Sequence, residues 1–227
     1  MITLTIEGKR IQTQPDRTLL EEAREHAIWI PTLCYHEALK PYGGCRLCVV
    51  ELETPRGPRL VAACTYPCED AAVVRTDTQT VRQSRQVAAE LLLARAGHIS
   101  FIQELAENLG VRTTPYTLPP DECILCTRCV RACREIVGVG AISMVERGAN
   151  REVTAPFRFS SADCIECATC VLVCPTGAIT LEDLTDRTRT LHTWPSEYAR
   201  RACRLCEYHA DGLSGNEKEK TNEHNDV

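Results

Sequence analysis

The chain has 227 residues, of which 15 are cysteines, and its formal net charge is −5. Its arginines are spread along the chain instead of forming a basic patch, which argues against a nucleic-acid partner. The absence of an apolar run of membrane-spanning length and of an export signal predicts a cytoplasmic protein without direct membrane insertion. In a reducing compartment, so many cysteines indicate metal binding and not disulfides.

The first part of the chain, which we place at residues 1–78, is predicted to be a small β-rich domain with one helix. Alternating apolar residues at 2–6, a turn at 7–10 and a strand from Ile11 predict a hairpin. Asp16 and Thr18 are candidate N-caps of a helix that continues to Ala27. A strand at 49–52, a turn at 54–58, a return strand that ends at Cys64 and a strand at 73–74 follow.

Four cysteines in this domain form the pattern C-x10-C-x2-C-x15-C and are a candidate cluster site: Cys34, Cys45, Cys48 and Cys64. Gly43 and Gly44 precede the close pair, and residues without a Cβ allow the backbone to approach cluster sulfurs. A plant-type [2Fe–2S] ferredoxin has a shorter first gap. We predict a [2Fe–2S] cluster here; the alternatives are a zinc site or buried free thiols.

Residues 79–115 are predicted to be a helical connector. Apolar periodicity predicts helices at 81–93 and 102–109, split by Gly97 and ended by Gly110.

The strongest motif follows in residues 116–185, where C-x2-C-x2-C-x3-C occurs twice. This is the two-cluster ferredoxin spacing, in which the fourth cysteine of each run binds the other cluster. The alternative is a pair of zinc ribbons. We predict two [4Fe–4S] clusters, held by two sets of ligands: Cys123, Cys126, Cys129 and Cys174 for the first; Cys164, Cys167, Cys170 and Cys133 for the second.

Residues 31–36, 44–51 and 63–65, followed by the double motif with Arg147-Gly148 between its halves, resemble one redox family. It includes the large iron–sulfur subunit of complex I, the N-terminal part of iron-only hydrogenases and the small diaphorase subunit of NAD-reducing hydrogenases. The resemblance covers roughly residues 1–206. It implies an α+β chain with a β-grasp [2Fe–2S] ferredoxin-like domain, the connector and a two-[4Fe–4S] ferredoxin-like domain. The short length is most similar to the small diaphorase subunit, or to a wire subunit of a formate dehydrogenase or bifurcating complex.

The resemblance also implies a further [4Fe–4S] cluster in the connector, held by one His and three Cys. His98 is present, but residues 100–105 supply no cysteine. We therefore expect this cluster to be absent and His98 to be structural or exposed. The [2Fe–2S] site would then lie closer to one of the two [4Fe–4S] clusters (cubanes), or it would receive electrons along a branch of the path that a partner subunit completes.

Three cysteines are left over near the end of the chain or between the sites. Cys203, Cys206 and His209, in the C-terminal segment 186–213, could form an additional zinc or iron–sulfur site together with Cys68. The alternatives are two reduced thiols or a site shared with another subunit. His36 is predicted to be a surface residue or a hydrogen-bond donor. Residues 214–227 are almost free of apolar side chains and are predicted to be a disordered tail.

No glycine-rich dinucleotide fingerprint follows a strand, so we predict electron transfer without bond chemistry. The resemblance implies an NAD(H)-binding flavoprotein subunit on one side and a hydrogenase or formate dehydrogenase catalytic subunit on the other. Two alternatives are a free-standing ferredoxin and a zinc-binding interaction protein.

Overall fold

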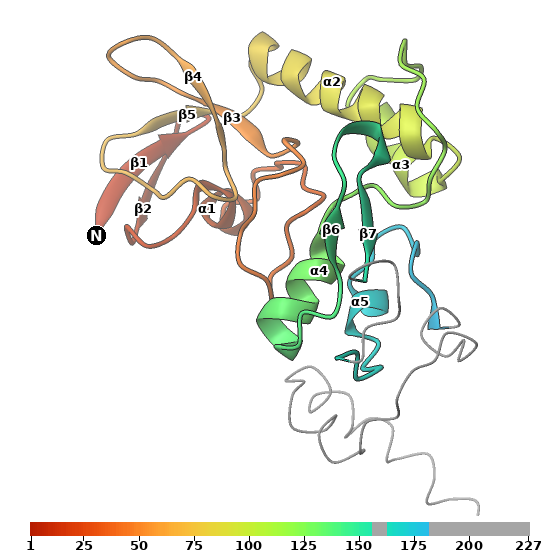
Figure 1. Cartoon of the computed structure of the whole chain (residues 1–227). Helices are drawn as coiled ribbons and strands as arrows, with labels where there is room; N and C mark the ends of the chain where they lie inside the picture. The colour runs from red at the N-terminus through yellow and green to blue at the C-terminus, as the bar shows by residue number, and fades with distance from the viewer. Residues whose placement is uncertain (156–162, 182–227) are drawn as a thin grey trace, which may run out of the picture. The chain divides into compact units, whose positions relative to one another are not determined.

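The computed structural model describes residues 1–155 and 163–181 (Figure 1). The chain divides into two compact units: the first comprises residues 1–126 with 147–151, and the second comprises 127–146 and the chain from 152 onward. The predictions for Cys203, Cys206, His209 and the tail lie outside the described residues.

A five-stranded mixed sheet forms the scaffold of the first unit, in the order β2-β1-β5-β3-β4 (Figure 1). The strands are β1 (Ile2–Ile6), β2 (Lys9–Thr13), β3 (Val49–Leu52), β4 (Arg59–Ala62) and β5 (Val73–Arg75). β1 pairs with β2 as the predicted hairpin and lies parallel to β5. The return strand ends two residues earlier than predicted, so Cys64 belongs to the turn that follows it.

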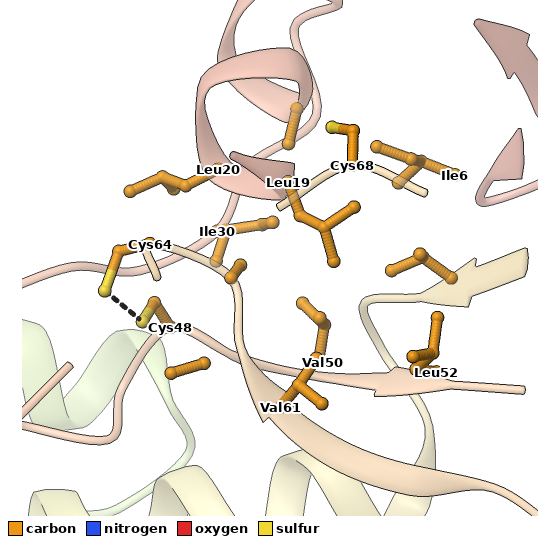
Figure 2. Packing of buried hydrophobic residues seen from close by; sticks show 14 of the residues in the cluster. Ile6, Leu19, Leu20, Ile30, Cys48, Val50, Leu52, Val61, Cys64 and Cys68 are labelled. Atoms are coloured by element: carbon orange, nitrogen blue, oxygen red, sulfur yellow. Dashed lines mark hydrogen bonds between the residues drawn. The ribbon is translucent and has the colours of Figure 1, made fainter. Parts of the chain in front are cut away.

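Helix α1 (Leu19–Glu25) begins at Thr18, whose side chain accepts from the Glu21 backbone N–H while the Glu21 carboxylate accepts from the Thr18 N–H. This reciprocal pair satisfies two N-terminal donors and confirms Thr18 as the cap. The prediction that the helix continues to Ala27 is wrong, because Ala27 has a φ of +54°, which no α-helix contains. Leu19 and Leu20 of α1 pack onto the sheet (Figure 2).

The connector forms the two predicted helices, α2 (Gln79–Ala96) and α3 (Ser100–Asn108). Gly97 caps α2, and a Cβ there would lie 2.5 Å from the Leu93 carbonyl oxygen. The break between the two helices therefore occurs at a residue that has no side chain to clash. The two helices enclose a second apolar core, whose buried members are Leu33, Leu47, Ala96, Ile102 and Ile124.

The second unit is smaller and is built around the cysteine runs. Helix α4 (Arg128–Ala132) continues directly into a π-helical turn, η1 (Cys133–Val137), and packs against α5 (Thr169–Leu172). Strands β6 (Ser143–Val145) and β7 (Glu152–Thr154) form an antiparallel hairpin. The 3-10 turn η2 (Gly148–Asn150) belongs to the first unit. None of the helices described is both long and apolar enough to cross a membrane.

Candidate metal centres

The four cysteines of the first unit come together from three separate segments. Cys34 follows α1, Cys45 and Cys48 lie in the loop before β3, and Cys64 lies in the turn after β4. The sulfurs of Cys48 and Cys64 are 3.3 Å apart (Figure 2), and Cys34 and Cys45 are hydrogen-bonded through their side chains. Three of these side chains are only 1% exposed, which places a nearly dry group of thiols at the edge of the sheet: Cys34, Cys48 and Cys64.

Because the thiols lie so close together, they form two hydrogen-bonded pairs, and within each pair the pKa values of the two thiols differ. The hydrogen bond with Cys34 lowers the pKa of Cys45 to about 5, and the same bond raises the pKa of Cys34. The hydrogen bond with Cys64 lowers the pKa of Cys48 to about 7, while that of Cys64 is raised. All four thiols cannot ionise together without nearby positive charge, because each new thiolate repels the others. Iron ions would supply that charge, so the donor set fits a [2Fe–2S] cluster.

The loop that carries Cys45 depends on Gly43. Gly43 has a φ of +68°, and a Cβ on it would lie 3.2 Å from Cγ2 of Thr65, next to Cys64. Arg46, between the two cysteines of the loop, is also left-handed, with a φ of +59°. Residues held in this region carry strain that persists only where the surroundings fix them, which is common at ligand loops. That Gly43 lets the backbone approach cluster sulfurs stays a prediction, and nothing in the sequence marks Arg46.

The two runs of the double motif share a backbone feature that their sequences do not reveal. In each run, the residues before and after the second cysteine are left-handed: Leu125 and Thr127 have φ of +56° and +64°, and Glu166 and Ala168 have φ of +55° and +57°. Such conformations turn successive backbone N–H groups into a concave surface that attracts anions, as at many iron–sulfur sites. Both runs therefore present an anion-binding loop.

In the second unit, the fourth cysteine of the first run lies near the three leading cysteines of the second run. Burial raises the pKa of Cys170 to about 11, and Cys167, Cys164 and Cys133 add to that rise through their negative charge. Burial also raises the pKa of Cys164, again with a contribution from Cys133. The Cys133 sulfur accepts a hydrogen bond from the Ala141 N–H at 3.2 Å. The donor set fits the predicted second [4Fe–4S] cluster.

The start of the first run is fixed by Arg95 at the end of α2. Its Nε donates to the carbonyl oxygen of Cys123 at 2.7 Å, and its Nη2 binds the Asp121 carboxylate at 2.6 Å. Asp121 in turn accepts from the Cys123 N–H at 2.8 Å. No sequence pattern signals this role of Arg95.

Cys174, the predicted fourth ligand of the first cluster, belongs to the second unit. Burial opposes its ionisation, but hydrogen bonds from Thr176 and nearby backbone N–H groups outweigh it, so its pKa is lowered. Cys123 and Cys126 belong to the first unit, and Cys129 and Cys174 to the second. That these four share a cluster stays a prediction. In the described ranges, no three His, Cys, Asp or Glu side chains already surround a single metal position.

The remaining candidates have simpler surroundings. Cys68 is 3% exposed within the apolar core of the first unit, apart from Cys48 and Cys64 (Figure 2), and burial raises its pKa to about 11. The additional site stays a prediction. His98 is exposed in the turn between α2 and α3, as expected. Nδ1 of His36 accepts a hydrogen bond from the Ala38 N–H at 3.2 Å, and its role as a surface residue or a donor stays a prediction.

Two known domain families match the chain. A 2Fe-2S iron-sulfur cluster binding domain matches residues 1–79, and a 4Fe-4S dicluster domain matches residues 122–178. These matches confirm the predicted cluster types and their order along the chain.

Curated relatives match over most of the chain. It is 36% identical to the NADP-reducing hydrogenase subunit HndD of Solidesulfovibrio fructosivorans over 79% of its length. It is 34% identical to a subunit of an NADH-quinone oxidoreductase of Rhizobium meliloti over 79%, and 32% identical to the NADPH-Fe(3+) oxidoreductase subunit alpha of Geobacter sulfurreducens over 92%. The chain spans 36%, 24% and 28% of the lengths of these relatives, respectively.

A solved structure supports the same relationship. A chain from an NAD+-reducing [NiFe]-hydrogenase in the H2-reduced state superposes with a TM-score of 0.67 at 27% identity, covering 78% of this chain and 86% of that one. The chain therefore belongs to the iron–sulfur family that these hydrogenase and NADH-quinone oxidoreductase subunits represent.

Proposed function

We propose that the chain is the electron-transfer subunit of a multi-subunit oxidoreductase in the cytoplasm. It relays single electrons between an NAD(H)-binding flavoprotein subunit and a catalytic subunit, for which a hydrogenase is our first choice. The observation that carries this proposal is the joining, in one chain, of a [2Fe–2S] domain and a [4Fe–4S] dicluster domain. When bound, such clusters supply one-electron chemistry.

Two predicted ligands of different clusters lie beside the same apolar core of the first unit. Cys45 of the [2Fe–2S] site and Cys126 of the first run both pack against the second apolar core. Both also line one largely apolar groove of about 800 Å³, beside Leu33 and Ile124. Largely apolar surroundings suit electron transfer, because few polar groups have to reorganise when charge moves. This supports the expectation that the [2Fe–2S] site can serve a cubane without a connector cluster.

The names of the relatives support the choice of partners. All three relatives described above are named as subunits of NAD(P)-linked enzymes, and the solved structure is of an NAD+-reducing hydrogenase. A formate dehydrogenase or a bifurcating enzyme would use the same cluster sets, so the partner decides the substrate.

An anaerobic pull-down of the tagged protein from its own host, with mass spectrometry and iron analysis, tests the proposal. We expect a brown protein that co-purifies in fixed ratio with a flavoprotein and a hydrogenase subunit. A formate dehydrogenase subunit in place of the hydrogenase would change the substrate. A brown monomer without partners would refute the subunit role in favour of a free ferredoxin, and a colourless zinc protein would refute electron transfer itself.

A further inference from the structure

Arg85, on helix α2, is a buried cation directly beside the [2Fe–2S] loop. It is 4% exposed, and its Nη2 donates to the carbonyl oxygen of Val49 at 2.8 Å. Val49 follows Cys48, one of the four candidate ligands. Within the described part of the chain, the Arg85 Nε is buried and has no hydrogen-bond partner. A guanidinium group in this state is costly, because buried charges require partners.

No carboxylate of the described residues neutralises Arg85, since none lies within the 4.0 Å of an ion pair. Burial lowers its pKa, and the charges of Asp77 and Cys48 act in the opposite direction. Asp77 is 62% exposed and already pairs with Arg82 at 2.8 Å, so solvent screens it. Cys48 is 1% exposed and is not screened in this way. The buried negative charge that faces Arg85 is therefore that of the cluster site.

We propose that Arg85 is the counter-cation of the [2Fe–2S] site and raises its reduction potential. The inference rests on the cluster assignment made under the proposed function. Reduction adds one electron to the cluster and neither breaks a bond nor moves a proton, because Arg85 is charged before and after. The cluster with four thiolates is already negative, and the added electron makes it more so. A nearby buried cation therefore stabilises the reduced form more than the oxidised form.

The contact to Val49 gives Arg85 a second role as a positioning residue, since it joins α2 to the loop that leaves Cys48. The two roles separate by substitution. Arg85→Gln keeps a donor for the carbonyl oxygen of Val49 and loses the charge. Arg85→Met loses both and fills the space with apolar atoms, and Arg85→Lys keeps the charge without the planar fork.

Arg82 is the matched control. It lies on the same helix, is 61% exposed and is paired with Asp77 on the surface. Arg82→Gln removes the same charge from the same element, but at a site where water and salt screen it. We expect no shift in the reduction potential for this variant.

The experiment is an anaerobic redox titration of the loaded full-length protein with dithionite as the reductant. The reduced [2Fe–2S] signal is followed by electron paramagnetic resonance, at a temperature where reduced cubanes relax too fast to be seen. For Arg85→Gln and Arg85→Met we expect about a tenfold smaller ratio of reduced to oxidised cluster at a fixed potential. For one electron this corresponds to a midpoint about 59 mV lower. Arg85→Lys should stay close to the wild type.

Unchanged midpoints in iron-loaded Arg85→Gln and Arg85→Met would overturn the proposal, as would an equal shift in Arg82→Gln. If neither neutral variant retains its [2Fe–2S] iron, Arg85→Lys decides. A lysine variant that keeps its [2Fe–2S] iron shows that the site needs the positive charge. A lysine variant that loses this iron shows that the site needs the shape of arginine and not its charge, which overturns the proposal. A wild type that gives no [2Fe–2S] signal would instead refute the cluster assignment, which distinguishes the two failures.

Discussion

Replacing Gly43 with alanine tests how the [2Fe–2S] loop is held. Gly43 has a φ of +68°, and the new Cβ would lie 3.2 Å from Cγ2 of Thr65. Thr65 cannot easily move away, because its hydroxyl donates to the Ala62 carbonyl oxygen at 3.2 Å. An L-residue in the left-handed region costs about 1–2 kcal/mol, and the tight contact adds about 1 kcal/mol, the low end for overpacking. We expect a total loss of about 2–3 kcal/mol in the free energy of unfolding.

Gly8→Ala is the matched control for the backbone term alone. Gly8 has a φ of +77° in the turn between β1 and β2, and a Cβ there would meet nothing within 4 Å. It should lose only the left-handed cost of about 1–2 kcal/mol. Each further kcal/mol lowers the melting temperature of a domain of this size by about 4–8 °C, so Gly43→Ala should melt lower by about that amount.

Circular dichroism melts, together with the paramagnetic signal of the reduced [2Fe–2S] cluster, provide the assay. We expect Gly43→Ala to weaken or alter the signal, because Gly43 lies two residues before Cys45, and Gly8→Ala to leave it unchanged. Equal melting temperatures and equal signals in the two variants would show that the contact with Thr65 carries no weight, and the reasoning from packing would fail.

Substitutions at three other positions address the cubane sites. Cys133→Ala, although in the first run, should remove the second [4Fe–4S] signal; loss of the first cubane from this variant would contradict the ligand exchange between runs. Ala168→Gly should raise the free energy of unfolding by up to about 1 kcal/mol in chemical denaturation, by relieving a left-handed φ, and Ala168→Val should lower it. Arg95→Met, which removes the contacts to Asp121 and Cys123, should lower the free energy of unfolding by about 1–3 kcal/mol and lower the iron content of the first cubane. Unchanged iron content and stability would show that these contacts do not hold the first run.

The parts of the fold that follow local rules could be predicted from the sequence. The hairpin at the start and the cap at Thr18 depend on neighbouring residues, and the structure contains both. The cysteine spacing likewise predicted the two cluster domains, because the loop length between ligands is itself a local property. The end of β4 before Cys64 was missed, since pairing with β3 and not residue preference sets where that strand stops.

The long-range contacts of the sites could not be predicted. A lone arginine on a helix gives no sign of burial, and its normal place is the surface, as for Arg82. The left-handed residues beside the second cysteine of each run are Leu125, Thr127, Glu166 and Ala168, none of them a glycine that would mark the turn. Only the surrounding structure holds them there, so the sequence shows the ligands but not the loops that aim them.

Helix α2 links the connector to both cluster sites of the first unit. Arg85 binds the backbone after Cys48, and Arg95 binds the backbone of Cys123. The two arginines are ten residues apart on one helix, which corresponds to about 15 Å along its axis. A rigid helix with one anchor at each site fixes the spacing of the [2Fe–2S] loop and the start of the first cubane run. We therefore predict that the connector acts as a spacer, and that substitution of its arginines changes the transfer of electrons without removing a ligand.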